Sequence, residues 1–272
     1  MTIKEYIKRN PKLLKLASFG FHMFSQIIPR NPFSILYRYF DYFMDLIRYK
    51  SFKGSEKIKL LNLYPCINDK ISETPIDFDY FYQDTWAAGK IFAVHSKYHV
   101  DVGSTALFVG ILSKFTKVCS VDIRPLPVQL ENLECKKGSI LDMPFKDGEL
   151  ESISSLCVLE HIGLGRYGDP FDPKGTDKAI KELTRVLAAN GNLYVSVPVE
   201  NKDTIYFNAH RAFNVNNFIS KFPDCNLVEV KIIRNKNIIL LQDFNNLNPL
   251  EMAGIGLFHF KKKQLNNRPV AN

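Results

Sequence analysis

The stretch that decides the fold runs from His99 to Arg124 and reads HVDVGSTALFVGILSKFTKVCSVDIR. Its apolar start around Val100 is too short for a helix and ends at Gly103, which predicts a buried strand of a parallel sheet. Residues 106–112 then have the periodicity of an amphipathic helix, and residues 117–122 are a second apolar run. Strand, glycine turn, helix and strand is the order of a right-handed βαβ unit.

Acidic residues stand at the carboxyl ends of both expected strands. Asp101 and Gly103 lie at the end of the first strand, where the amino-terminal N–H groups of the helix point back at the turn. Asp122 closes the second strand about twenty residues beyond the turn, a place from which a carboxylate accepts hydrogen bonds from a ribose diol. The sequence therefore predicts a nucleotide-type ligand at this edge of the sheet.

Beyond this unit, residues 95–235 resemble the class I S-adenosylmethionine-dependent methyltransferases. The resemblance is carried by successive strings, VDVGS, SVDIR, GSILDMPF, LEHIG and LTRVLAANGNLYVSVPV. Within that superfamily, VDIRPLP, LEHIGLGRYGDPFDPKG and FNAHR resemble an uncharacterised methyltransferase-like family, a domain of unknown function whose bacterial members are often associated with surface polysaccharide synthesis.

This resemblance implies a fold and a cofactor. The fold is Rossmann-like α/β, with a mostly parallel seven-stranded sheet, helices on both faces and an antiparallel final hairpin. The cofactor is S-adenosylmethionine, which leaves S-adenosylhomocysteine as product. The residues that the motifs place at the cofactor are Asp101, Gly103, Ser104, Asp122, Ile123, Ser139, Ile140 and Cys157.

Two departures from the superfamily pattern concern this cofactor site. Class I enzymes usually have two or three glycines in the first turn, whereas here Gly103 is followed by the string STA. Side chains are therefore expected to crowd the place where the backbone approaches the methionine end of the cofactor. The position that usually supplies an acid for the adenine is Ser139, with Asp142 three residues later. We expect weaker or differently shaped adenosyl binding.

Catalytic candidates follow the fourth and fifth expected strands. His210, in FNAHR, is the first choice for a general base toward a hydroxyl acceptor, because an imidazole accepts a proton near neutral pH. A histidine that only fixes its loop is the alternative. Glu160 and His161, in LEHIG, are further catalytic candidates, and structural support of the fourth strand's end is the alternative for both.

The loop at residues 163–175, GLGRYGDPFDPKG, is long and rich in glycine and proline, which is typical of a functional loop and predicts a lid ordered by ligand. Arginines in and near it suit capture of phosphate or carboxylate, or they pair with Asp169 or Asp172 to hold the loop closed. The candidates for acceptor binding are Arg166, Tyr167, Asp169 and Arg211. Three carboxylates and one imidazole near this loop are also potential magnesium ligands, namely Asp169, Asp172, Asp177 and His161. Because carboxylates in such loops more often cap turns, no metal site is predicted.

Residues 1–77 are expected to form a basic, aromatic-rich helical region. Residues 1–60 contain twelve Lys or Arg and four acids, which gives +8, while the rest of the chain is balanced at 24 against 24. Leu36, Phe40, Phe43 and Ile47 share one face of a helix over residues 35–47. Such a helix packs on the catalytic domain or on a second subunit, or lies on an anionic membrane. The sequence leaves these alternatives open.

Several further observations concern the domain bounds, the cellular compartment and the kinds of ligand that are disfavoured. The catalytic domain is expected over residues 78–262, followed by a disordered tail at 263–272. Five cysteines without CxxC pairing favour reduced thiols in the cytoplasm, and the absence of a signal peptide is expected as well. No apolar stretch reaches the roughly twenty residues of a membrane span. The catalytic region has no net positive charge, and LCVLEH is unlike the NPPY-like motif of amino-methylating DNA enzymes, which disfavours nucleic acid.

The preferred interpretation is a cytoplasmic methyltransferase acting on a small or carbohydrate acceptor, such as a hydroxyl of a nucleotide-linked or lipid-linked sugar in surface polysaccharide synthesis, with peripheral membrane contact through residues 1–60. The alternative is a catalytically silent Rossmann-like scaffold whose basic N-terminal helices bind partners or a membrane, and the glycine-poor turn favours it. Cofactor binding separates the two.

Overall fold

The computed structural model describes residues 13, 16, 32–240 and 253–264. The chain divides into two units, Met1–Pro75 and Ile76–Asn272, close to the boundary expected between residues 77 and 78. Most of the expected tail, residues 265–272, lies outside the described residues.

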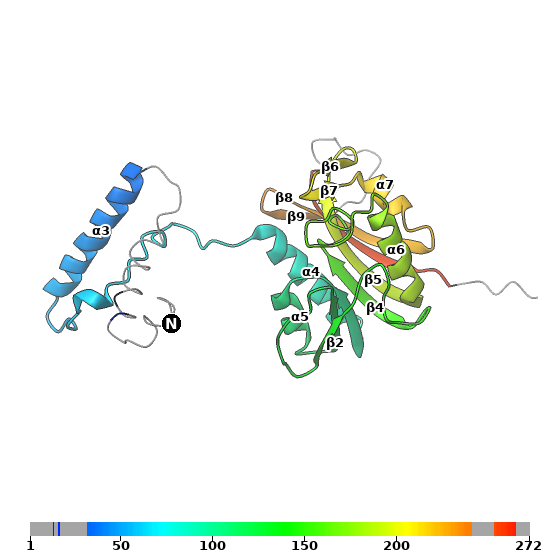
Figure 1. The fold of residues 1–272 in the computed structure, drawn as a ribbon, viewed down its shortest axis with the longest axis horizontal. Coiled ribbons are helices and arrows are strands. Elements are labelled where there is room, and N and C mark those ends of the chain that lie inside the picture. The colour runs from blue at the N-terminus through cyan, green and yellow to red at the C-terminus, as the bar shows by residue number, and fades with distance from the viewer. Residues whose placement is uncertain (1–12, 14–15, 17–31, 241–252, 265–272) are drawn as a thin grey trace, which may run out of the picture. The chain divides into compact units, whose positions relative to one another are not determined.

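The second unit is built on an eight-stranded sheet in the order β3-β2-β1-β4-β5-β10-β8-β9 (Figure 1). The first five strands in this order are mutually parallel, and β10 is antiparallel to both of its neighbours. The strands are β1 (Tyr98–Val102), β2 (Lys117–Asp122), β3 (Leu133–Lys137), β4 (Leu150–Leu156), β5 (Leu187–Val199), β8 (Cys225–Arg234), β9 (Asn237–Leu240) and β10 (Gly254–Lys262).

The Rossmann-like fold class is confirmed, but the expected number of seven strands is wrong. The extra strand is β9, which pairs with β8 at the edge of the sheet. Asn235 and Lys236 connect the two strands, and both have positive φ, +49° and +62°. A two-residue hairpin loop favours this geometry, which usually requires glycine. The Asn-Lys pair lacks that glycine, so the turn is weakly marked in the sequence.

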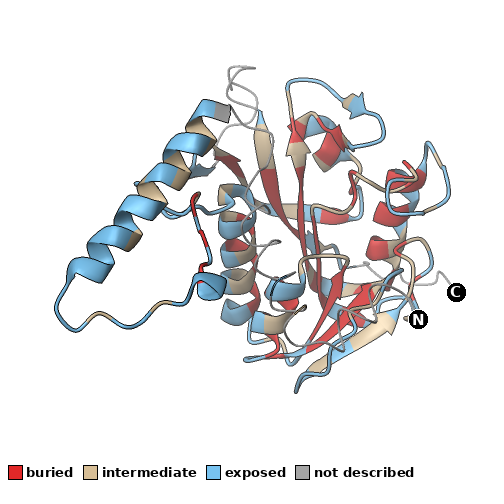
Figure 2. Ribbon diagram, turned by 60° about the vertical axis from the view of Figure 1, so that its left-hand side comes forward, coloured by how far each residue is buried: buried red, intermediate tan, exposed pale blue. Residues whose placement is uncertain are grey.

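Helices cover both faces of the sheet. Apolar side chains of α6 and α7 join one core cluster, whereas those of α4 and α5 join a second cluster on the other face (Figures 1 and 2). The helices are α4 (Phe78–Ala93), α5 (Ala106–Leu112), α6 (Gly175–Val186) and α7 (Val215–Ser220), and a separate hairpin is formed by β6 (Thr204–Tyr206) and β7 (His210–Ala212). This is the layered arrangement that the resemblance implied.

Helix α6 differs at both ends from its expected span. The sequence DKAIKELTRVLAANG predicts a helix with Thr176 as its N-cap and Gly191 as its C-terminal stop. In the structure Lys174 occupies the cap position, and the Thr176 hydroxyl donates to the carbonyl of Leu159 at 2.8 Å. The helix ends at Val186, and β5 begins at once at Leu187 instead of after Gly191.

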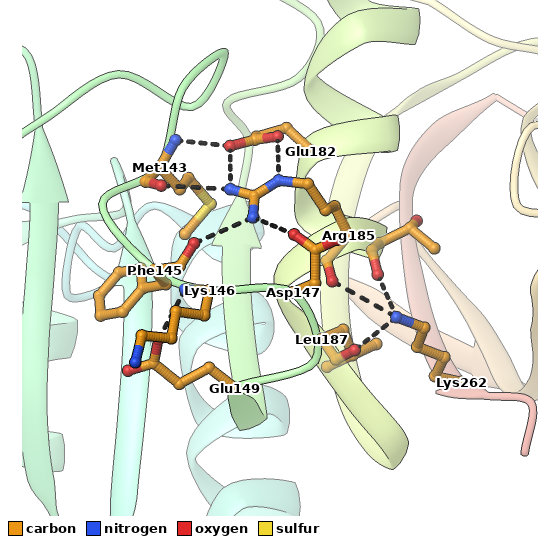
Figure 3. Close-up of polar contacts among 10 residues, drawn as sticks. Met143, Phe145, Lys146, Asp147, Glu149, Glu182, Arg185, Leu187 and Lys262 are labelled. Carbon is orange, nitrogen blue, oxygen red and sulfur yellow. Dashed lines mark hydrogen bonds and ion pairs between the residues drawn. The ribbon is translucent and has the colours of Figure 1, made fainter.

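Arg185 on α6 anchors the loop that follows β3. Its guanidinium donates to the carbonyls of Met143 and Phe145 at 3.3 and 3.0 Å and pairs with the Asp147 carboxylate at 2.6 Å (Figure 3). Glu182, one turn earlier, accepts both from Arg185 and from the Met143 N–H. These contacts fix residues 143–147 of the loop against α6.

The first unit contains α3 (Pro32–Ser51) and the short helix η1 (Leu60–Asn62). The helix expected over residues 35–47 lies within α3. None of the helices in the described part of the chain combines the length and the apolar character that crossing a bilayer requires.

Candidate functional site

A cavity of about 340 Å³ opens at the carboxyl ends of β1, β2 and β4, within the usual size range of small-molecule sites. Most of the residues expected at the cofactor border it. They are Gly103, Ser104, Asp122, Ile123, Ser139, Ile140 and Cys157. The remaining one, Asp101, is fully buried beside Ser104.

Ser104 braces the turn at the base of the cavity. Its hydroxyl donates to Asp101 Oδ2 at 2.5 Å and accepts from the Leu156 N–H at 3.1 Å. Its own N–H donates to Asp101 Oδ1 at 3.1 Å. Burial raises the pKa of Asp101 to about 6 in spite of these donors. The turn therefore ties the end of β1 to the end of β4.

Thr105 and Gly103 complete this turn. The Thr105 hydroxyl donates to Asp84 Oδ2 at 3.0 Å and accepts from the Phe108 N–H, which caps α5. Gly103 has a φ of +73°, and a Cβ there would lie 3.2 Å from both methyl groups of Val158. One glycine is thus needed, and the two hydroxyls that follow it are bonded to protein partners. The residues that carry these hydroxyls still border the cavity, so the crowding expected from the sequence stays a prediction.

Asp122 lies beside the turn, as its place at the end of β2 predicts. Its Oδ1 accepts from the Arg124 N–H at 2.7 Å, and its Oδ2 lies 3.8 Å from the point a Cβ on Gly103 would occupy. Within the described residues, Oδ2 has no hydrogen-bond donor. In the third motif, the Ser139 hydroxyl accepts from the Leu141 N–H at 3.1 Å, whereas Asp142 is exposed and does not border the cavity.

His161 borders the same cavity and is held in one tautomer. Its Nδ1 lies 2.7 Å from the carbonyl oxygen of Ala209. Because a carbonyl only accepts, Nδ1 carries the proton and Nε2 of the neutral ring has a free lone pair. Burial is the main cause that lowers the pKa of His161, so the ring is neutral at pH 7.

Glu160 is buried behind His161. Its Oε1 lies 3.6 Å from His161 Nε2, and its Oε2 has no hydrogen-bond partner within the described part of the chain. Burial raises the pKa of Glu160 to about 8, so the carboxyl group is mainly protonated at pH 7. The pair is therefore a neutral acid beside a neutral imidazole.

The loop at 163–175 is folded around Asp169. Asp169 Oδ2 accepts from the Gly163 N–H at 2.7 Å and Oδ1 accepts from the Tyr167 N–H at 3.3 Å. The Tyr167 ring lies between the guanidinium groups of Arg124, at 4.7 Å, and Arg166, at 5.1 Å. Tyr167 and Asp169 border the cavity, as predicted, while Arg166 is outside its lining and donates to the Ala209 carbonyl.

His210 and Arg211 do not border the cavity. His210 packs against Tyr206 within the β6–β7 hairpin, with the ring centres 5.1 Å apart. Arg211 is buried, and its guanidinium donates to the Ile162 carbonyl at 2.7 Å and to the Thr176 hydroxyl at 3.3 Å. These positions depart from the acceptor-facing roles expected of both residues. The FNAHR segment instead holds the LEHIG segment in place.

Helix α4 contributes residues that the sequence marked only weakly. Gln83 is buried, and its side-chain oxygen accepts from the Cys157 thiol at 2.9 Å and from the Ser196 hydroxyl at 2.6 Å. Tyr80 borders the cavity, and burial raises its pKa to about 12.

Arg124 also borders the cavity, but it was not among the residues expected at the site. It directly follows the Asp122 motif in the string VDIR.

Each of the carboxylates considered as a magnesium ligand contacts a different group of the protein. Asp172 pairs with Lys178 at 2.6 Å and Asp177 with Lys221 at 2.8 Å, while Asp169 binds backbone N–H groups. Over residues 32–240 and 253–264, no group of three or more His, Cys, Asp or Glu side chains is placed to hold a metal ion.

Comparison with protein families gives one match. Residues 141–219, which include LEHIGLGRYGDPFDPKG and FNAHR, match the family described as Caenorhabditis protein of unknown function, DUF268. The resemblance to a domain of unknown function is thereby confirmed. No curated protein matches the chain.

Solved structures share the fold at low sequence identity. The [4+2]-cyclase SpnF is similar with a TM-score of 0.50 and 11% identity, over 66% of this chain and 80% of that chain. The Burkholderia thailandensis 1,6-didemethyltoxoflavin-N1-methyltransferase, solved with bound 1,6-didemethyltoxoflavin and S-adenosylhomocysteine, has a TM-score of 0.49 and 12% identity, over 71% of this chain and 93% of that chain. A putative sarcosine dimethylglycine methyltransferase from Galdieria sulphuraria has a TM-score of 0.49 and 16% identity, over 67% and 85%.

Because one of these structures is named a cyclase, the shared fold does not assign a reaction. The strand order, the turn at Gly103 and the similarity to SpnF together identify the second unit as an α/β unit of the class I methyltransferase-like fold.

Proposed function

We propose that this chain is an S-adenosylmethionine-dependent methyltransferase that acts on a hydroxyl of a small or carbohydrate acceptor. The observation that carries the proposal is that one cavity is bordered by the Gly103 turn, the Asp122 carboxylate and His161. The first two suit an adenosyl group, and the third supplies a base for a hydroxyl.

The side chains around the cavity fit the cofactor. Asp122 Oδ2 is available to accept from ribose hydroxyls, and the left-handed turn at Gly103 leaves its backbone without a Cβ beside that carboxylate. Ile123, Ile140 and Val158 give apolar walls suited to an adenine ring. When bound, S-adenosylmethionine supplies the activated methyl group and S-adenosylhomocysteine is the product.

We assign the general base to His161, where the sequence had favoured His210. A base must reach the proton that it removes, and His161 borders the cavity whereas His210 does not. The Ala209 carbonyl keeps the proton on Nδ1, so Nε2 is the atom that accepts the proton of the acceptor hydroxyl. Because the Glu160 carboxyl is mainly protonated at pH 7, it does not raise the pKa of the ring, and burial keeps that pKa below its usual value in spite of the nearby Asp169 carboxylate.

Arg124 and Tyr167 support an acceptor that carries a phosphate. Arg124 borders the cavity, and its guanidinium makes no ion pair with a carboxylate in the described residues. A guanidinium binds phosphate in bidentate fashion, and the ring of Tyr167 holds it in place by cation–π contact at 4.7 Å. A nucleotide-linked or lipid-linked sugar, as used in polysaccharide synthesis, combines this phosphate with hydroxyl groups.

The setting that we propose is the cytoplasm, including the inner face of the membrane. All five cysteines are free, and Cys119 and Cys225 are buried, which supports a reducing compartment.

The test uses methyl-labelled S-adenosylmethionine with nucleotide sugars and polyprenyl-phosphate sugars as acceptors. We expect label on a sugar hydroxyl with the wild-type protein. The His161→Asn variant should lower turnover by about 10² or more, while donor affinity stays within about threefold. His210→Asn is the matched control and should keep turnover. Label on an amine or a nucleic acid, or a larger loss from His210→Asn than from His161→Asn, would contradict the proposal.

A further inference from the structure

Helix α3 leaves its apolar face uncovered by the described residues of its own unit. Leu36, Phe40 and Ile47 are 71%, 61% and 62% exposed, although they lie on one stripe of the helix. Most of the α3 ribbon is coloured as exposed in Figure 2. With about 100° per residue, these three and the exposed Tyr37, Phe43 and Met44 fall within an arc of about 120°. A helix normally turns such a stripe toward a core.

The opposite, polar face of α3 is the one that makes contacts. Arg38 donates to the Ile67 carbonyl at 3.2 Å and to the Asn68 side chain at 3.3 Å. Lys70 pairs with Asp41 at 2.7 Å and with Asp45 at 2.9 Å. Asp41 and Asp45 are the acids of α3, so Lys70 neutralises both of its negative charges, at about 140° and 180° around the helix from Leu36.

The borders of the apolar stripe are basic. Arg48 and Lys50 in the last turn project on either side of the stripe, at about 120° and −40° from Leu36. Lys53, Lys57 and Lys59 follow and are exposed, and within the described residues no carboxylate pairs with any of these five cations. Glu56, the acid among them, contacts the Tyr49 hydroxyl.

We propose that α3 lies on the surface of an anionic membrane, with the stripe Leu36, Tyr37, Phe40, Phe43, Met44 and Ile47 inserted at the boundary between headgroups and acyl chains. An exposed apolar stripe with basic borders fits this surface, because the cations meet anionic headgroups while the stripe leaves water. The inference is independent of methyl transfer. If it holds, the membrane concentrates lipid-linked acceptors near the catalytic unit.

Charge decides against a second copy of α3 as the occupant. Two parallel helices would bring Arg48 and Lys50 of one copy against the same cations of the other. In an antiparallel pair they would face the first turn of the partner helix, which contains no acid. The acids Asp41 and Asp45 already pair with Lys70, so they do not neutralise these cations in either arrangement.

Sedimentation of the full chain with vesicles tests the proposal. We expect binding to phosphatidylcholine vesicles that contain about a quarter phosphatidylglycerol and at least tenfold weaker binding to pure phosphatidylcholine. Arg48→Gln with Lys50→Gln should weaken binding to the anionic vesicles by about tenfold. Lys97→Gln with Lys114→Gln, the same change of charge at exposed sites of the catalytic unit, is the matched control and should leave it unchanged.

A fluorescence measurement tests the insertion of α3 without relying on the folding of these charge variants. The chain has one tryptophan, Trp86, which is buried and gives a constant background. In Phe40→Trp, the added emission should shift to the blue on vesicle binding and be quenched by lipids with a nitroxide on the acyl chain. Unquenched emission, equal binding to neutral and anionic vesicles, or a stable dimer in light scattering that Phe40→Asp dissolves would overturn the proposal.

Discussion

His161 Nδ1 lies 2.7 Å from the carbonyl oxygen of Ala209, a residue 48 positions later in the chain. This contact fixes both the orientation of the imidazole and the nitrogen that carries its proton. Nε2 is left as the basic atom in the cavity. The proposed base is therefore positioned by the β6–β7 hairpin, in which the sequence had placed the base itself.

The tautomer of His161 can be measured without an acceptor. Nitrogen-15 NMR should show Nδ1 protonated and Nε2 unprotonated at pH 7, and the pKa should fall below 6.5 because burial disfavours the imidazolium. The signals that disappear in His161→Asn belong to this ring, and His210→Ala should leave them in place. A protonated Nε2, or a pKa above 6.5, would remove His161 as the base.

Glu160 should make stability depend on pH in a defined window. The pKa of Glu160 is about 8 in the folded protein, against 4.5 for the ordinary group. Between pH 4.5 and pH 8 the folded state therefore binds a proton at Glu160 that the unfolded state has released. Its contribution to stability is fully present below about pH 4.5 and is lost as the pH rises to about 8, by at most about 1.4 kcal/mol per pH unit.

The variant Glu160→Gln has no group that binds or releases a proton at position 160. Its free energy of unfolding relative to wild type should therefore increase from pH 5 to pH 8, as measured by urea unfolding at each pH. Glu134→Gln, at a site on β3 whose side chain is 57% exposed, should run parallel to wild type. A Glu160→Gln curve parallel to wild type would mean that Glu160 is ionised in the fold.

The glycine at position 103 should be intolerant of substitution, unlike a glycine in the next helix. Gly103→Ala forces a side chain into left-handed backbone and against Val158, so it should lower the free energy of unfolding by about 1–2 kcal/mol. Gly110→Ala, in α5 with nothing within 4 Å of the added Cβ, should leave it unchanged or raise it by about 0.4–1 kcal/mol. Equal effects in thermal or urea unfolding would contradict the assigned turn.

Arg211 should affect stability more than ligand affinity. Arg211→Met removes the donors to the Ile162 carbonyl and the Thr176 hydroxyl in a buried place, which should cost about 1–3 kcal/mol of unfolding free energy. Lys178→Met, which breaks an ion pair with an exposed lysine, should cost less than about 1 kcal/mol. If Arg211→Met keeps full stability and only weakens acceptor binding, the role expected from the sequence is the right one.

Local patterns were sufficient to predict the central part of the fold. The order of strand, turn, helix and strand from His99 to Arg124 placed β1, α5 and β2, and it placed Asp122 beside Gly103. Each of these features depends on residues close together in the chain, where hydrophobic period and turn chemistry act directly.

Long-range contacts explain what the sequence could not predict. Whether His161 or His210 reaches the cavity depends on hydrogen bonds between the LEHIG and FNAHR segments, about fifty residues apart, which neither motif reveals alone. The Thr105 hydroxyl is a second example, because its acceptor, Asp84, lies on α4 and 21 residues earlier in the chain.

The most direct test of the central claim is calorimetry with S-adenosylhomocysteine. The account predicts one site per chain in the wild-type protein and a loss of about 1–3 kcal/mol in binding free energy, or roughly 5- to 150-fold in affinity, for Asp122→Asn. Asp142→Asn, an exposed acid in the third motif outside the cavity, should bind like wild type. Absence of binding by the wild-type protein would contradict the proposed function and favour the scaffold, whereas equal affinity in Asp122→Asn would contradict the role assigned to Asp122.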